Sequence, residues 1–132
     1  ISATPLTNGA TFKLFDAAAR SGAFGNVVTY STNQSVTWDT SRLTVDGTIT
    51  VASAVSTQLP NVTTIISGGV LGISWPTNYL GWHLLGQTNS VNVGLSTNIA
   101  DWYYVPDSAA TNAVFLNIDS TKGAVFYRLV FP

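Results

Sequence analysis

The sequence predicts an all-β protein, and three observations carry the prediction. The one helix-friendly run, residues 16–20 (DAAAR), is a single turn long and is followed at once by Ser21-Gly22. Short runs of β-branched and aromatic residues fill the rest of the chain, cut by Gly, Asn, Asp or Pro. About ten strands at such short, regular spacing favour an antiparallel β-sandwich over an α/β fold.

The chain carries few charges for its 132 residues. Only 8% of them are charged, where about a quarter is usual, and every acidic residue is Asp. A net charge of −1 with no basic cluster argues against electrostatic binding to nucleic acid. No apolar run approaches the length of a membrane-spanning helix. A hydroxyl-rich, nearly uncharged surface is typical of exported bacterial β-proteins and of surfaces that pack against copies of themselves.

Cysteine is absent, which excludes disulfides, thiol catalysis and zinc–thiolate sites. The chain begins at Ile1 with no targeting segment in front of it. We therefore expect a mature, exported protein that acts outside the cell or at its surface.

In the first half of the chain, residues 11–15 (TFKLF) are the first clear strand and follow the turn pair Asn8-Gly9. Residues 26–30 (NVVTY) predict a second strand. In residues 43–51 (LTVDGTITV), apolar side chains alternate around Asp46-Gly47, which predicts a hairpin with one buried face.

Residues 56–61 (STQLPN) have the proline and polar content of a linker. We therefore expect two coupled halves, residues 1–56 and residues 57–132. The second half continues as strands joined by short turns, the first turn at Gly68-Gly69. Its last strand, residues 125–131 (VFYRLVF), is apolar on both faces, which predicts that it lies centrally or is covered on both sides.

The residues that could carry catalysis or hold a metal are few and scattered. The single histidine, His83, stands in a predicted strand, where it faces solvent or a neighbour, and no paired carboxylates or nucleophile elbow accompany it. Asp101, Asp107 and Asp119 stand in turns without the Asp-x-Asp spacing of a calcium loop, and such residues commonly cap turns. We therefore expect no enzyme activity, no metal and no cofactor.

The aromatic residues of the second half allow two interpretations. An exposed strip of Trp82, Trp102 and Tyr103 would stack on sugar rings, as in many carbohydrate-binding modules. Trp in a sandwich strand is more often part of the core, and this is the expectation for Trp38, Trp75 and Trp82. Trp102 and Tyr103 remain open to either interpretation.

Two asparagines match the acceptor pattern for an N-linked glycan. Asn33 begins NQS and Asn61 begins NVT. Both lie in predicted turns or linkers, where a glycan would be accessible in an organism that glycosylates exported proteins.

Two longer stretches resemble a known family. Residues 4–51, with the marks "TPLTNGATFKLFDAAARSGAFGNV" and "VTWDTSRLTVDGTITV", resemble the short β-repeat associated with autotransporter passengers and other large exported proteins of planctomycete and verrucomicrobial bacteria. Residues 71–132, with "SWP", "GW", "QTN" and the terminal "VFYRLVFP", resemble the β-domain that often closes those proteins. The resemblance implies an exported protein of immunoglobulin- or fibronectin-like architecture and carries over no catalytic residues. In the family pattern a complete strand precedes TPLTNGATFKLF, where this chain has only ISA.

The first half supplies too few strands for a two-layered core, so something must complete it. A free sheet edge can receive a strand from another chain, as in pilus subunits. The opening segment is uncharged and apolar at Ile1, Ala3 and Leu6, as a donated strand requires, and Pro5 is tolerated there. We therefore expect a structural subunit of an extracellular bacterial fibre or pilus-like filament, a helical homopolymer joined by exchange of the N-terminal strand.

Two other functions fit the same sequence. The chain could be the C-terminal module of a large exported surface protein, in which case the missing strand belongs to the same polypeptide. It could also be a carbohydrate-binding accessory module that uses Trp82, Trp102 and Tyr103.

Overall fold

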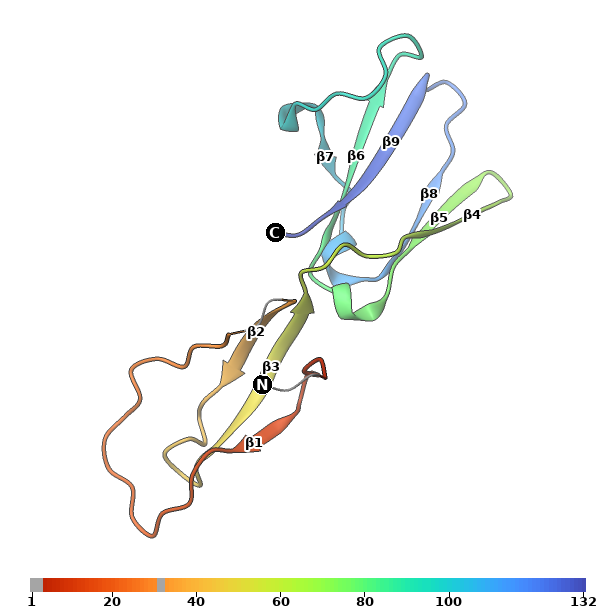
Figure 1. Ribbon diagram of the computed structural model, residues 1–132. Helices are drawn as coiled ribbons and strands as arrows, with labels where there is room; N and C mark the ends of the chain where they lie inside the picture. Colours follow the sequence, from red (N-terminus) through yellow and green to blue (C-terminus); the bar gives the residue numbers. More distant parts are fainter. Residues whose placement is uncertain (1–3, 31–32) are drawn as a thin grey trace. The chain divides into compact units, whose positions relative to one another are not determined.

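The computed structural model describes residues 4–30 and 33–132. The described chain confirms the predicted all-β class, with nine strands against the expected ten or so, three short 3₁₀ turns and no α-helix (Figure 1). The strands form three antiparallel sheets of three strands each. They belong to two compact units, Ile1–Gln58 and Leu59–Pro132. Within the described residues, no helix has the length and apolar character needed to cross a membrane.

The N-terminal unit holds one sheet with the strand order β1-β3-β2. Its strands are β1 (Thr11–Lys13), β2 (Gln34–Asp39) and β3 (Thr48–Ser56). β1 and β2 both run antiparallel to β3 and therefore run in the same direction as each other. The Gly9 N–H donates to the Val51 carbonyl at 2.9 Å and the Leu14 N–H donates to the Gly47 carbonyl at 2.8 Å. The chain thus follows β3 from residue 9 to residue 14.

The two faces of this sheet differ in chemistry, as strand alternation requires. Phe12, Ile49, Val51 and Trp38 share one face, where Ile49 and Val51 are buried. The Phe12 and Trp38 rings meet edge to face on it, with centroids 5.9 Å apart. The other face carries polar side chains, namely Thr11, Lys13, Thr37, Asp39, Thr48 and Thr50.

The hairpin predicted over residues 43–51 is wrong. Residues 40–46 form successive turns, and the strands that pair with β3 are β1 and β2, which both end before these turns. The Asp46 carboxylate holds the end of these turns, because it accepts hydrogen bonds from the Thr48 N–H at 3.1 Å and the Thr48 hydroxyl at 2.6 Å. Residues 26–30, also predicted as a strand, belong to no sheet, and the Thr29 hydroxyl accepts a hydrogen bond from the Trp38 indole.

The C-terminal unit holds two sheets, with the orders β4-β5-β8 and β7-β6-β9. The first consists of β4 (Thr63–Ser67), β5 (Val70–Ser74) and β8 (Ala113–Asn117), and the second of β6 (His83–Asn89), β7 (Tyr103–Tyr104) and β9 (Ala124–Val130). The turn predicted at Gly68-Gly69 joins β4 to β5, and both glycines have positive φ, 56° and 79°. The 3₁₀ turns lie in the connections, at Thr77–Tyr79, Ile99–Asp101 and Ser108–Ala110.

The core of this unit draws on both sheets and on the segments between them. Its buried apolar residues are Ile73, Trp75, Tyr79, Trp82, Leu84, Leu85 and Val105. The core role predicted for Trp75 and Trp82 is therefore confirmed, whereas Trp38 of the N-terminal unit is only partly buried. Among the described residues β9 pairs with β6 alone and is an edge strand, so the first of the two alternatives predicted for it, a central position, is wrong. Six of its seven residues are half-buried.

Candidate functional site

The C-terminal unit contains a groove between its two sheets. Strand pairing places Ile66, Leu71 and Leu116 in one cross-strand row, on the same face as the buried Ile73. Residues of this row and of the second sheet line a common hollow of about 410 Å³. Its aliphatic lining consists of Ile66, Leu71, Leu116, Ile118 and Val125. The inner faces of the two sheets therefore meet in the core at one end and leave apolar side chains open at the other.

The second sheet contributes two tyrosines to this groove, one on each side of a glycine. Tyr103 and Tyr127 flank Gly86 in one cross-strand row. The Tyr103 ring lies so close over Gly86 that a Cβ at this position would stand 2.6 Å from it. Partial burial, and then the charge and hydrogen bond of Tyr103, raise the pKa of Tyr127 above its ordinary value. The two tyrosines thus line the groove together with its aliphatic residues and with the polar side chains of Thr88, Asn117, Asp119 and Lys122.

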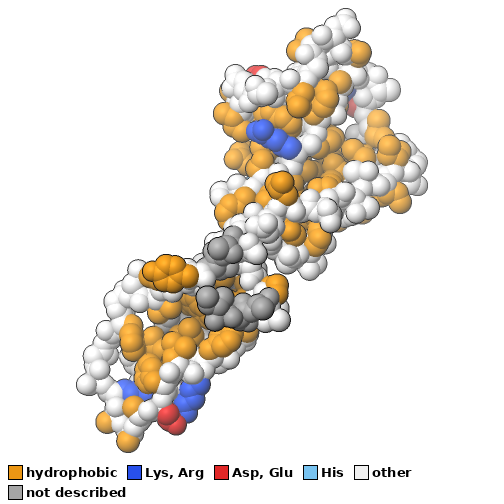
Figure 2. Space-filling view, in the orientation of Figure 1, with side chains coloured by type: hydrophobic (Ala, Val, Ile, Leu, Met, Phe, Trp, Pro, Cys, Tyr) orange, Lys and Arg blue, Asp and Glu red, His pale blue; other side chains and the backbone are white. Residues whose placement is uncertain are grey.

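The groove is open along the free edge of β4. Among the described residues β4 has β5 as its only strand neighbour, and all five of its residues are exposed. Ile66 is 69% exposed and Ile118 is 50% exposed. Figure 2 shows hydrophobic side chains in the gap between the two sheets of this unit. A free strand edge beside exposed apolar side chains is the combination that receives an added β-strand.

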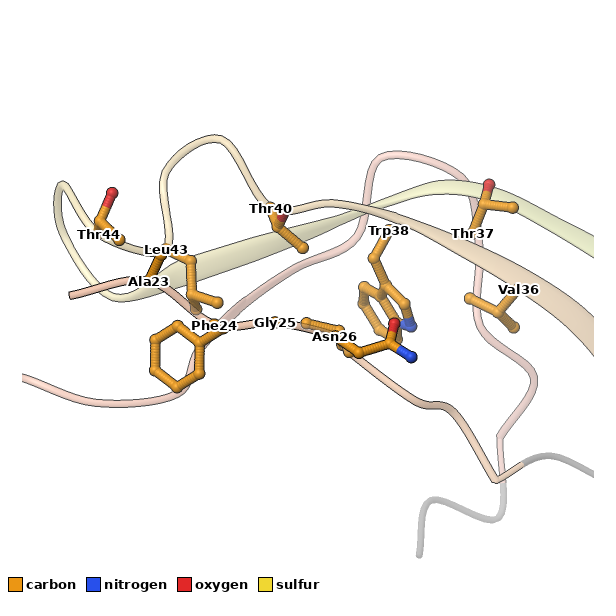
Figure 3. Close-up of a pocket in the computed structure, with 11 residues that line it drawn as sticks. Ala23, Phe24, Gly25, Asn26, Val36, Thr37, Trp38, Thr40, Leu43 and Thr44 are labelled. Atoms are coloured by element: carbon orange, nitrogen blue, oxygen red, sulfur yellow. The ribbon is translucent and has the colours of Figure 1, made fainter.

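The N-terminal unit has a hollow of its own, of about 540 Å³, on the apolar face beside β2 (Figure 3). Val36, Trp38 and Leu43 line it from the side of the sheet, and residues 23–27 line it from the other. The Trp38 side chain points from β2 toward this crossing segment (Figure 3). Phe24 is 59% exposed, so the segment covers the sheet only loosely.

The residues predicted as a donated strand lie partly outside the described chain. Ile1 and Ala3 are not among the described residues. Leu6 is half-buried, and the side-chain amide of Gln34 holds its backbone on both sides. The Leu6 N–H donates to Gln34 Oε1 at 2.8 Å, and Gln34 Nε2 donates to the Leu6 carbonyl at 2.9 Å. Leu6 is thereby held to the first residue of β2 in its own unit.

The three aromatic residues predicted to stack on sugars do not share one surface. Trp82 is 3% exposed, so its ring packs inside the core and offers no open surface to a sugar. Trp102 is partly buried, and the Arg128 guanidinium lies 4.2 Å from its ring centroid. Tyr103 is 48% exposed and lies in the groove between the sheets. Of the three, only Tyr103 offers an open aromatic surface.

The remaining candidate residues are scattered over the described chain. Asn33 and Asn61 are both exposed, and the Asn33 side-chain oxygen accepts a hydrogen bond from Gln58 at 3.2 Å. The His83 ring packs edge to face against Tyr104, with centroids 5.1 Å apart. Within residues 4–30 and 33–132, no three His, Cys, Asp or Glu side chains gather as a metal site requires.

Comparisons with protein-family models, with curated proteins and with solved structures found no match.

The groove of the C-terminal unit was not predicted by the sequence analysis. Its lining comes from strands that are far apart in the chain, and sequence periodicity does not tell which strands face each other. One signal was available: Ile65 and Ile66 are adjacent in β4, so one of the two must lie on each face of the sheet.

Proposed function

We propose that this protein is a non-enzymatic structural subunit of an extracellular bacterial fibre, joined by strand exchange between copies. In this proposal the two sheets of the C-terminal unit form an immunoglobulin-like sandwich that lacks one strand. The N-terminal segment of a neighbouring copy, residues 1–6, fills the groove between the sheets. The observation that carries the proposal is the aliphatic row of the exposed Ile66 and the half-buried Leu71 and Leu116 beside the free edge of β4.

The chemistry of the donor supports this assignment. A donated strand gains its affinity from backbone hydrogen bonds to the edge and from alternate side chains that enter apolar pockets. The segment ISATPL carries no charge, and Ile1 and Ala3 alternate as such a strand requires. Its length is close to that of β4, which has five residues. A contact of this head-to-tail kind does not close on itself and therefore builds a filament.

Disulfide trapping tests the proposal, because the chain has no cysteine of its own. Ala3→Cys combined with Ile66→Cys in the full chain should give, on mild oxidation, a ladder of covalent oligomers. The matched control is Ala3→Cys with Ile65→Cys, since Ile65 is the next residue on the opposite face of β4 and is exposed to a similar degree, 64% against 69%. Equal ladders from both pairs, or monomer alone from the Ile66 pair, would contradict strand exchange in this groove.

A second candidate function is that of a module in a large exported surface protein. The contact that favours it is the clamp of Gln34 on the backbone of Leu6, which holds the N-terminal segment on its own unit. Strand exchange predicts that Gln34→Leu leaves the Ala3–Ile66 ladder intact or strengthens it. The module function predicts no ladder in either background and a less stable N-terminal unit in the Gln34→Leu chain.

A further inference from the structure

The sheet of the N-terminal unit has two free edges that match each other. β1 and β2 are the outer strands, and among the described residues each pairs with β3 alone. They run in the same direction, so a copy of the sheet moved sideways would bring β1 alongside β2 with the faces aligned. The edges are also equal in length, because the chain follows β3 over residues 9–14 and β2 has six residues.

Opposite charges stand at the two edges on the same face. Thr11, Thr50 and Asp39 form one cross-strand row, and Lys13 lies two residues further along β1. Lys13 is 54% exposed, and its ion pair to Asp16 at 3.1 Å is itself exposed and therefore weak. Asp39 is exposed, and a hydrogen bond from the Ser41 N–H lowers the pKa of its carboxyl, so it is ionised at neutral pH.

The opposite face is apolar at both edges. Phe12 projects from β1 and is 39% exposed. At β2, the hollow beside Val36 and Trp38 is open on the same face (Figure 3). In the register that brings Lys13 beside Asp39, Phe12 of the incoming β1 lies diagonally opposite Trp38, where the apolar area of both partners leaves water.

We infer that the N-terminal units of two copies join edge to edge, with β1 of one copy running parallel to β2 of the next and Lys13 of one beside Asp39 of the other. The partner is therefore a second copy of this chain. Symmetric contacts match less well, since β1 against β1 brings two Lys13 side chains together and β2 against β2 leaves Asp39 without a cation. Diagonal neighbours on paired strands are about 7–8 Å apart, within reach of a lysine side chain. The contact uses neither the groove of the C-terminal unit nor the donated segment, so it goes beyond the proposed function.

Charge reversal with rescue tests the contact, using the full chain and sedimentation velocity at low salt. Lys13→Asp places a second carboxylate beside Asp39, and Asp39→Lys places a second ammonium beside Lys13, so each variant alone should associate at least about tenfold more weakly than the wild type. In an equimolar mixture, the introduced aspartate of one variant meets the introduced lysine of the other, while the native Lys13 meets the native Asp39. The mixture should therefore recover association to within about threefold of the wild type. Asp16→Asn is the control for loss of the local ion pair and should behave as the wild type does.

Three outcomes would overturn the inference: a wild-type chain that does not associate, single variants that associate as well as wild type, or a mixture no better than its components. Circular dichroism confirms that each variant is folded before it is scored. Trapping of Ala3→Cys with Ile66→Cys in the Lys13→Asp background separates this contact from strand exchange. If the disulfide ladder persists while edge association is lost, the two contacts are independent, and either can fail without the other.

Discussion

The C-terminal unit buries more large apolar residues than the N-terminal unit, although both units also leave many of them exposed. Seven buried apolar residues belong to the described part of the C-terminal unit, and only Leu43, Ile49 and Val51 belong to that of the N-terminal one. In the latter, Leu14, Phe24 and Tyr30 are 55%, 59% and 95% exposed. The difference follows from layering, because a sheet buries an apolar face only against a second layer.

The second layer is what the N-terminal unit lacks. The long segment between β1 and β2 crosses the apolar face, and over its described residues it forms no strand and leaves the hollow beside Trp38. A three-stranded sheet depends for its stability on the packing of its hydrophobic face. We therefore expect the N-terminal unit to be the less stable of the two and the one that gains most from association.

Trp82→Ala should have the largest effect, and it should fall on the C-terminal unit. The ring is 3% exposed and meets Tyr79 and Phe131 edge to face, with centroids at 5.5 and 5.6 Å. Its removal leaves a large cavity and should cost about 3–5 kcal/mol of unfolding free energy, or more than about 10 °C in melting temperature. Thermal unfolding followed by near-ultraviolet circular dichroism measures it. Tyr30→Ala, at a 95% exposed ring, should stay within about 0.5 kcal/mol.

Gly47→Ala should come next and should unfold the N-terminal unit selectively. Gly47 has φ 78°, and a Cβ there would stand 2.0 Å from the Phe15 carbonyl oxygen. Backbone strain and steric overlap together should cost about 3 kcal/mol. Gly9→Ala is the matched control, since Gly9 has φ 83° in the same unit with no atom within 4 Å of its Cβ position. It should cost about 1 kcal/mol. The Trp38 indole resonance reports urea unfolding in both, and equal costs would disprove the steric account.

Gln87→Leu and Gln34→Leu compare the same pair of hydrogen bonds in the two units. The Gln87 side-chain amide accepts from the Ser96 N–H at 2.9 Å and donates to the Ser96 carbonyl at 3.4 Å. The Gln34 side chain bonds the backbone of Leu6 in the same way. Gln87 is 0% exposed, so leucine there leaves buried polar groups unpaired and should cost about 1–3 kcal/mol. Gln34 is half-buried, and water can replace its hydrogen bonds, so its replacement should cost about 1 kcal/mol or less. Urea unfolding of each unit measures the loss of unfolding free energy in each variant. Equal losses at Gln87 and Gln34 would show that burial is not the cause of the difference.

The sequence predicts the β-class and most strands of the C-terminal unit because there local patterns and tertiary pairing agree. Gly68-Gly69 forms the predicted turn, and Trp75 and Trp82 form the predicted core. In the N-terminal unit the local pattern is misleading, since the alternation of residues 43–51 is interrupted by a turn that Asp46 caps. No local signal separates a strand from an extended segment that crosses a sheet, as residues 26–30 do. The groove depends on which sheets face each other, and that is decided by packing between strands distant in the chain.

Acid should weaken the N-terminal unit through that same Asp46, by less than the substitutions above. Hydrogen bonds from the Thr48 hydroxyl, and then from Arg42, lower the pKa of its carboxyl from 3.8 to about 2. A folded-state pKa below the unfolded one stabilises the fold above about pH 4, and this contribution is lost as the pH falls toward 2. The urea midpoint of the N-terminal unit should therefore fall more between pH 5 and pH 2.5 in the wild type than in Asp46→Asn.

Asp119 offers the matching test in the C-terminal unit. It accepts hydrogen bonds from the Thr121 hydroxyl and N–H in the same two-residue turn, and these lower its pKa as well, with a smaller contribution from the charge of Lys122. Because Asp46 also accepts hydrogen bonds from Arg42, Asp119→Asn should remove a smaller part of the acid dependence of its unit. If Asp119→Asn removes more of the acid dependence than Asp46→Asn does, the hydrogen bonds from Arg42 do not add to the stabilisation that the ionised Asp46 carboxylate provides. The acid sensitivity of the N-terminal unit would then have to come from its other ionised carboxylates, Asp16 and Asp39, whose pKa values are also lowered.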